Sequence, residues 1–314
     1  MKPVDRAAGS RRAFLRAGLV GLAGFCAACA SNARQPGKRL LEPVFSIGGG
    51  RQVARMDVAG GVRPDAIGGY IPFIFPVAVA AHANGDIFIA DAGASRLYRY
   101  DRGLDALITL PEKHIGITTR LQIGPDGSVY VLDGTGAEIR RYSRIGQRLT
   151  LMQPRLPAGH YSEFAVDPLS GKVYAVDSSN LSIDEIHPLG QASIDLQRID
   201  EPGPIASDGR SVWVAGSLCR CVTEWTYGRK GRVLAAGQLQ SPRAITLLDG
   251  RLFAIDGVDR VVAYVHEQGV ERLVPSSLGL MLPEGLHAAQ GLLFVADGAG
   301  RRVSAFRPGF EVRP

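Results

Sequence analysis

The sequence predicts an all-β protein, a six-bladed β-propeller of four-stranded blades closed by an N-terminal strand. A turn glycine, a short apolar strand and an acidic position recur six times, and the acidic positions are separated by 42, 44, 39, 40 and 41 residues. A period near forty residues is typical of propellers and solenoids. No long segment has the 3.6-residue periodicity of a helix, which argues against helical repeats and βαβ units.

The first copy shows how one repeat is built. Asn84 and Gly85 form a tight-turn pair, residues 87–90 are apolar, residues 91–95 are small and polar, and residues 97–100 alternate large side chains. This order predicts a turn, a strand, a turn and a second strand.

The other copies share the turn glycine and the apolar strand. They span residues 127–133, 171–177, 209–216, 250–256 and 291–297. Five of the six copies end in aspartate, whereas the fourth has Gly216 in that position. We expect the five aspartates to accept turn N–H groups and to pair with the arginine that often follows, because copies in a ring lie one per blade, too far apart to share a metal.

Additional strands are expected on both sides of each apolar strand. Short segments rich in small or apolar residues precede the turn glycines and suit innermost strands: 77–82, 121–124, 164–167, 204–207, 244–247 and 285–288. An arginine and then an aromatic residue follow in most copies, as in Arg96 and Tyr100, and a variable outer strand follows at 107–110 and 232–235. Four strands per forty residues make one propeller blade.

These motifs resemble those of the NHL-repeat family of six-bladed β-propellers, over roughly residues 45–310. The resemblance implies a ring around a central channel, in a single domain over residues 44–314. We expect residues 44–47 or 53–58 to close the ring beside residues 302–306. The family includes enzymes, scaffolds and binding modules, so the resemblance implies little about activity.

The first 29 residues have the parts of a bacterial export signal. Arg11 and Arg12 precede an apolar run at residues 17–28, which is short for a transmembrane span and matches a twin-arginine signal. Cys29 follows two alanines, as in a lipoprotein cleavage site, although Cys26 occupies the usual leucine position. Lipidation of Cys29 is therefore expected, and ordinary cleavage after an alanine is the alternative.

This organisation predicts a localisation and argues against one partner. Residues 30–43 would tether the domain to the periplasmic side of the envelope, and Ala30 favours the outer membrane by resemblance to enterobacterial sorting. Residues 1–29 carry a net charge of +4 of the whole chain's +6, so the exported part is nearly neutral. Without a basic stripe, nucleic acid is not an expected partner.

Three polar residues are candidates for a metal site at one end of the channel. His82 and His287 end innermost strands of the first and sixth blades, which are neighbours in a closed ring, and Asp167 has the equivalent position in the third. Two imidazoles and a carboxylate suit zinc or another divalent cation, and six-bladed amidating lyases resemble this use of channel histidines. The alternative is that each histidine hydrogen-bonds to backbone or water.

Two further sets of residues invite a chemical interpretation. Glu163 and Glu284 begin innermost strands, as in lactonase-type propellers that hold a cation, but no matching asparagine stands beside them. Cys219 and Cys221 are expected on one face of a strand, about 7 Å apart and too distant for an unstrained disulfide. Unpaired, packed thiols are therefore expected, and the alternatives are a soft-metal site or a strained redox bridge between the two cysteines.

The sequence favours an exported, membrane-anchored module that binds or scaffolds at the bacterial cell envelope, holding an envelope protein or an extracytoplasmic ligand. The alternative is a metal-dependent hydrolase or lyase, lactonase-like or amidating-lyase-like, with its site at the channel mouth.

Overall fold

The computed structural model describes residues 40–309, except 57, 58, 60, 65–67, 113, 155–158, 188–193, 200, 202 and 227–228. Residues from Leu40 onward form one compact unit. Arg11, Arg12 and Cys29, and with them the predicted signal and most of the predicted tether, lie outside the described residues. In the described part, no helical segment has the length and apolarity that crossing a bilayer requires.

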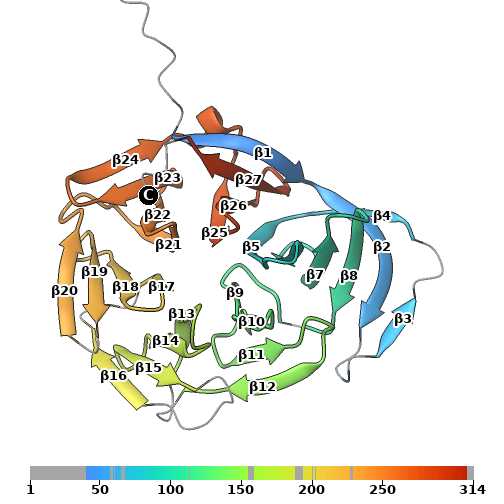
Figure 1. Cartoon of the computed structure of the whole chain (residues 1–314), viewed down its shortest axis with the longest axis horizontal. Helices are drawn as coiled ribbons and strands as arrows, with labels where there is room; N and C mark the ends of the chain where they lie inside the picture. The colour runs from blue at the N-terminus through green and yellow to red at the C-terminus, as the bar shows by residue number, and fades with distance from the viewer. Residues whose placement is uncertain are drawn as a thin grey trace, which may run out of the picture. The chain divides into compact units, whose positions relative to one another are not determined.

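The structure confirms an all-β propeller (Figure 1). Five of its six sheets have four strands, as expected, and the remaining sheet has seven. Innermost strands β5, β9, β13, β17, β21 and β25 contact one another in that order, and β25 contacts β5. They therefore surround the central channel (Figure 1).

The sheets follow one another around the ring in the chain order of their innermost strands, and each sheet runs from its innermost strand outward. The largest sheet contains β5 (Pro76–Ala81), β6 (Asp86–Asp91), β7 (Arg96–Asp101), β8 (Ala106–Leu110), β2 (Gly49–Met56), β3 (Val62–Pro64) and β4 (Tyr70–Pro72). The next contains β9 (Arg120–Ile123), β10 (Val129–Leu132), β11 (Ile139–Tyr142) and β12 (Arg148–Met152). The third contains β13 (Tyr161–Val166), β14 (Val173–Asp177), β15 (Ser182–Ile186) and β16 (Ile194–Arg198). The fourth contains β17 (Ile205–Ser207), β18 (Val212–Gly216), β19 (Cys221–Thr226) and β20 (Arg229–Leu234).

The last two sheets complete the ring. One contains β21 (Pro242–Leu248), β22 (Arg251–Asp256), β23 (Val261–His266) and β24 (Gly269–Leu273), which the short 3-10 helix η1 (Pro275–Leu278) follows. The other contains β25 (Pro283–Ala289), β26 (Leu292–Asp297), β27 (Arg302–Pro308) and β1 (Leu41–Ile47). β1 pairs antiparallel with β27, so the expected closure by an N-terminal strand is confirmed.

The seven-stranded sheet is larger than the predicted four-stranded blade. β2 pairs parallel with the outer strand β8, and β3 and β4 pair with β2. β1 and β2 are separated only by Gly48, so the chain leaves one sheet and immediately joins the outer edge of the next. This arrangement covers an edge that would otherwise expose unpaired backbone groups.

The hydrophobic core lies between neighbouring sheets. One cluster joins Val77 and Phe88 of the largest sheet to Leu121 and Val129 of the next. Side chains on both faces of the middle strands are buried, since each sheet packs between two others; β6 and β18 are buried at every position. The sheets therefore stabilise one another as stacked layers.

The recurring aspartates are structural, as expected, but they bind more than their own turns. Asp91 accepts hydrogen bonds from Ala94 N in the following turn and from the N–H groups of Ile74 and Phe75, which precede β5. Asp177, Asp256 and Asp297 also bind the segment that leads into their innermost strand. These four carboxylates therefore tie the end of the second strand to the segment that begins the blade, whereas Asp133 binds Thr135 in its own turn and Arg140.

The expected arginine partner is found for one aspartate and differs for two. Arg140 pairs with Asp133, as expected. Asp256 pairs with Arg272 and Asp297 with Arg302, rather than with Arg260 and Arg301. Arg260 and Arg301 are the last residues of their turns, with φ of 49° and 53°, so their backbone continues the turn instead of the strand.

Candidate functional site

Each end of the channel opens into a cavity. At the end where the innermost strands begin, a cavity of about 340 Å³ is lined by Arg120, Ser162, Glu163, Arg243, Glu284 and nearby residues; we call it the strand-start mouth. At the opposite end, a cavity of about 350 Å³ is lined by Gln122, Ser207, Asp208, Thr246, His287 and apolar residues; we call it the strand-end mouth. A small cavity of about 30 Å³ shares Arg120, Glu163 and Glu284 with the first mouth and Gln122 and Ile245 with the second.

The structure does not bring His82, Asp167 and His287 together. Of the three, only His287 lines the strand-end mouth. The His82 ring lies against Gly127 of the next sheet, where an added Cβ would be 3.1 Å from its Cε1, and its Nδ1 accepts the N–H of Asn84. Asp167 accepts the N–H groups of Leu169 and Ser170, which close the turn after β13.

His287 bridges two blades and is held in the neutral form. Its Nε2 lies 3.1 Å from the carbonyl oxygen of Ala81 on β5, so the ring donates this hydrogen bond. Burial lowers the pKa of His287 to about 4, against the weaker opposing effect of the Ala81 hydrogen bond. The alternative interpretation, a histidine hydrogen-bonded to backbone, describes this residue.

No group of three or more His, Cys, Asp or Glu side chains that could hold a metal ion is found among the described residues.

The two glutamates that suggested a lactonase-type site both form ion pairs with arginines. Glu163 forms a two-oxygen salt bridge with Arg120 Nε, at 2.8 and 2.9 Å, and Glu284 pairs with Arg260. Both pairs link neighbouring sheets, so they fasten the ring at the strand-start mouth.

The electrostatics of this mouth are unbalanced. It gathers three arginines, Arg120, Arg243 and Arg260, against two glutamates. Burial, and then repulsion by Arg243, lower the pKa of Arg260. Burial also raises the pKa of Glu163, against the attraction of Arg120. The three arginines outnumber the two carboxylates, so the channel opening carries a net positive charge.

Arg243 and Ser162 have unused hydrogen-bonding capacity. The Arg243 side chain is exposed on β21 and has no ion pair or hydrogen bond with any described residue. Ser162 Oγ is buried and likewise has no partner in the described part of the chain. Sequence reasoning missed both residues, because the expected innermost segments 164–167 and 244–247 begin after Ser162 and Arg243, which the structure includes in β13 and β21.

Cys219 and Cys221 form a disulfide, so the prediction of unpaired thiols is wrong. Their Cα atoms are 5.2 Å apart instead of the expected 7 Å. Cys219 belongs to the turn before β19, and the intervening Arg220 has a φ of 51°. Strand alternation therefore does not apply to this pair. The equivalent turns of other blades also end in a residue with positive φ, such as Arg260 and Arg301. The repeat therefore placed Cys219 in a turn, and this was the signal that could have revealed the bond.

Comparison with known proteins supports the fold. No protein-family model matches the sequence. Human teneurin-1 is 27% identical over 173 residues, which are 55% of this chain but 6% of teneurin-1. Similar solved structures include virginiamycin B lyase from Staphylococcus aureus, with a TM-score of 0.56 and 10% identity over 85% of this chain and 99% of that one.

Two other solved structures have comparable similarity. A gluconolactonase from Xanthomonas campestris has a TM-score of 0.58 and 13% identity, over 85% of this chain and 98% of that one. An auxiliary nutrient binding protein from Bacteroides ovatus has a TM-score of 0.59 and 14% identity, over 75% of this chain and 70% of that one. At these identities the likeness shows the propeller fold alone, which hosts both enzymes and binding proteins.

Proposed function

We propose that this chain is an exported protein, anchored to the bacterial cell envelope through Cys29, that binds a small anionic ligand at the strand-start mouth of its propeller. In this proposal the seven-stranded sheet takes the place of the sixth blade. The observation that carries the ligand assignment is that Arg243 is exposed and has no partner among the described residues, beside two glutamates that already have arginine partners.

The chemistry of the mouth supports an anion. An arginine guanidinium matches the oxygens of a carboxylate or phosphate with two parallel hydrogen bonds. An anion bound to Arg243 would also offset its repulsion of Arg260. The cavity of about 340 Å³ is within the range of small-molecule sites, and Ser162 Oγ supplies an additional hydrogen-bonding group. The similar nutrient-binding propeller supports a binding role on this fold.

The ligand assignment is tested by thermal unfolding of the purified protein with a panel of compounds. Carboxylates, sugar acids and phosphate esters form the anionic part, and neutral sugars and alcohols of matched size are the controls. A bound ligand at 100 times its Kd stabilises the folded state by about 2.7 kcal/mol, so the midpoint rises by several degrees. Anions should raise the midpoint of the wild type and raise that of Arg243→Gln by about half as much or less, because a tenfold weaker affinity halves the stabilisation at this ligand concentration. Equal shifts with neutral compounds, or no shift with any anion, would contradict the proposal.

The export and anchoring part is tested separately, because it depends on different residues. In cells of a bacterium with a twin-arginine export system, the wild type should fractionate with membranes, and Cys29→Ala should be released as a soluble periplasmic protein. Replacing Arg11 and Arg12 with lysines should retain the protein in the cytoplasm. Membrane association that persists in Cys29→Ala would overturn the anchor and leave the ligand site untouched.

A further inference from the structure

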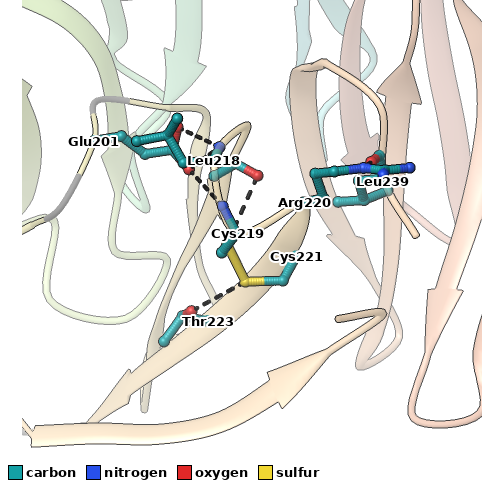
Figure 2. The surroundings of a disulfide bond; sticks show 8 residues. Glu201, Leu218, Cys219, Arg220, Cys221, Thr223 and Leu239 are labelled. Carbon is teal, nitrogen blue, oxygen red and sulfur yellow. Dashed lines mark hydrogen bonds between the residues drawn. A yellow bond between two sulfur atoms is a disulfide. The ribbon is translucent and has the colours of Figure 1, made fainter. Parts of the chain in front are cut away.

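The Cys219–Cys221 disulfide lies at the turn between β18 and β19 of the fourth sheet, outside the innermost strand β17, and plays no part in the proposed binding site. Figure 2 shows its surroundings. We propose that this disulfide is a thiol–disulfide exchange site that oxidises a pair of cysteine thiols in a partner polypeptide.

A structural staple is a poor explanation for this bond. A disulfide stabilises a fold mainly by restricting the unfolded chain, and its effect grows with the length of the loop that it closes. Cys219 and Cys221 are two positions apart, so the bond closes one of the shortest possible loops. Around it, β18 and β19 are already joined by a regular antiparallel ladder from Val212 to Gly216. The sheet therefore does not need the bond to hold its strands together.

The two cysteines differ in exposure. Cys219 is in an exposed turn, whereas Cys221 begins β19 and is 3% exposed. A cavity of about 120 Å³ adjoins Cys219 and is walled by Ile199, Leu218 and Trp225. An incoming thiol can thus approach Cys219, and the cavity offers space for an apolar side chain that flanks the attacking cysteine.

Glu201 distinguishes the two sulfurs electrostatically. Its carboxylate accepts the N–H groups of Leu218 and Cys219, at 2.6 and 3.3 Å (Figure 2). It occupies the space that the repeat aspartate would fill, since a Cβ at Gly216 would lie 2.2 Å from Glu201 Oε1. A carboxylate beside Cys219 disfavours a negative charge on its sulfur. Glu201 therefore favours departure of the charge on Cys221 over Cys219, and this effect opposes the cost of burying a charge on Cys221.

Thr223 can stabilise that charge. Its Oγ1 lies 3.7 Å from Cys221 Sγ, and because a disulfide sulfur carries no proton, the hydroxyl is the donor (Figure 2). A hydrogen bond to a thiolate favours the charged form. Exchange is faster when the sulfur that leaves forms a more stable thiolate, so this hydrogen bond favours Cys221 as the leaving sulfur.

These features define a balanced reaction. A thiolate of the partner attacks Cys219 Sγ, the Cys219–Cys221 bond breaks, and its electron pair leaves on Cys221 Sγ. The second thiolate of the partner then attacks the partner's own sulfur in the mixed disulfide and releases Cys219. The partner loses two electrons and forms a disulfide, and the two protons from its thiols end on Cys219 and Cys221.

The test uses the purified full chain and a synthetic peptide with a single cysteine as the probe. After a short reaction, N-ethylmaleimide alkylates the free thiols, and trypsin cuts after Arg220, which separates the two cysteines from each other and from Cys26 and Cys29. We expect the probe on the peptide 211–220 at least tenfold more often than on 221–229, with the alkyl group on Cys221. Thr223→Val should slow the exchange at least threefold and leave the site of attachment unchanged.

Two results would overturn the proposal. One is the absence of exchange, or attachment of the probe to Cys221 as often as to Cys219. The other comes from comparing the wild type before and after reduction by a phosphine, which needs no substitution. An exchange site predicts unfolding midpoints within about 2 °C of each other, whereas a loss of 10 °C or more on reduction would identify a structural staple.

Discussion

Replacing Asp91 with alanine is expected to lower the free energy of unfolding by about 4 kcal/mol. The carboxylate is fully buried and accepts three backbone N–H groups, from Ile74 at 2.7 Å, Phe75 at 2.8 Å and Ala94 at 3.1 Å. Alanine would leave these donors without partners and would detach the start of β5 from the turn after β6. Each hydrogen bond to a charged group contributes about 1.5–3 kcal/mol, and local rearrangement offsets part of the loss.

The measurement is denaturant-induced unfolding of the wild type and two variants. Asp259→Ala is the matched control, because this aspartate is exposed and is expected to change the free energy of unfolding by less than about 0.5 kcal/mol. A loss below 1 kcal/mol in Asp91→Ala would show that the carboxylate does not hold the blade together.

Lowering the pH from 7 to 4 is expected to cost about 3 kcal/mol of stability through His287 alone. The pKa of its buried imidazole is about 4, against a usual value of 6.5. Above pH 6.5 the ring is neutral in both states and the contribution is fully present. As the pH falls toward 4, the unfolded chain takes up a proton that the folded protein excludes, so the free energy of unfolding decreases. Below pH 4 both states are protonated and this loss ends.

The variant His287→Gln isolates this effect, because a side-chain amide can donate to the Ala81 carbonyl but does not titrate. Other groups, including Glu163 with its raised pKa, titrate in both proteins and are removed by taking the difference. Between pH 7 and pH 4, the free energy of unfolding should decrease by about 3 kcal/mol more in the wild type than in the variant. Equal pH dependence would show that the imidazole is not excluded from protonation.

The sequence contained enough to predict the ring, because each repeat encodes its own turns. The pair Asn84-Gly85 and the acid at Asp91 bracket β6 closely, and β1 closes the last sheet as expected. The addition of β2 to the outer edge of β8 was not predictable, since parallel pairing between separate segments leaves no turn signal in the sequence.

The sites were predicted less well, because they depend on the direction of side chains. His82 directly follows β5 and His287 lies within the neighbouring innermost strand β25, yet one ring lies against Gly127 and the other donates to Ala81. Arg220 has a positive φ in the turn before β19, and this conformation brings Cys219 and Cys221 together. In the regular strand that the sequence predicted, the two cysteines would be too far apart. Arg243 belongs to no sequence motif, and its proposed role could be inferred only once the partners of Glu163 and Glu284 were known.

The central claim, that Arg243 binds an anionic ligand at the strand-start mouth, is tested most directly by titration calorimetry. The strongest anion from the thermal panel is titrated into the wild type, Arg243→Gln and the control Arg307→Gln, an exposed arginine on β27. Loss of a charge-assisted pair costs about 1.5–3 kcal/mol, so Arg243→Gln should bind at least tenfold more weakly without loss of stability, and Arg307→Gln should bind like the wild type. Equal affinity of Arg243→Gln and the wild type would contradict the claim.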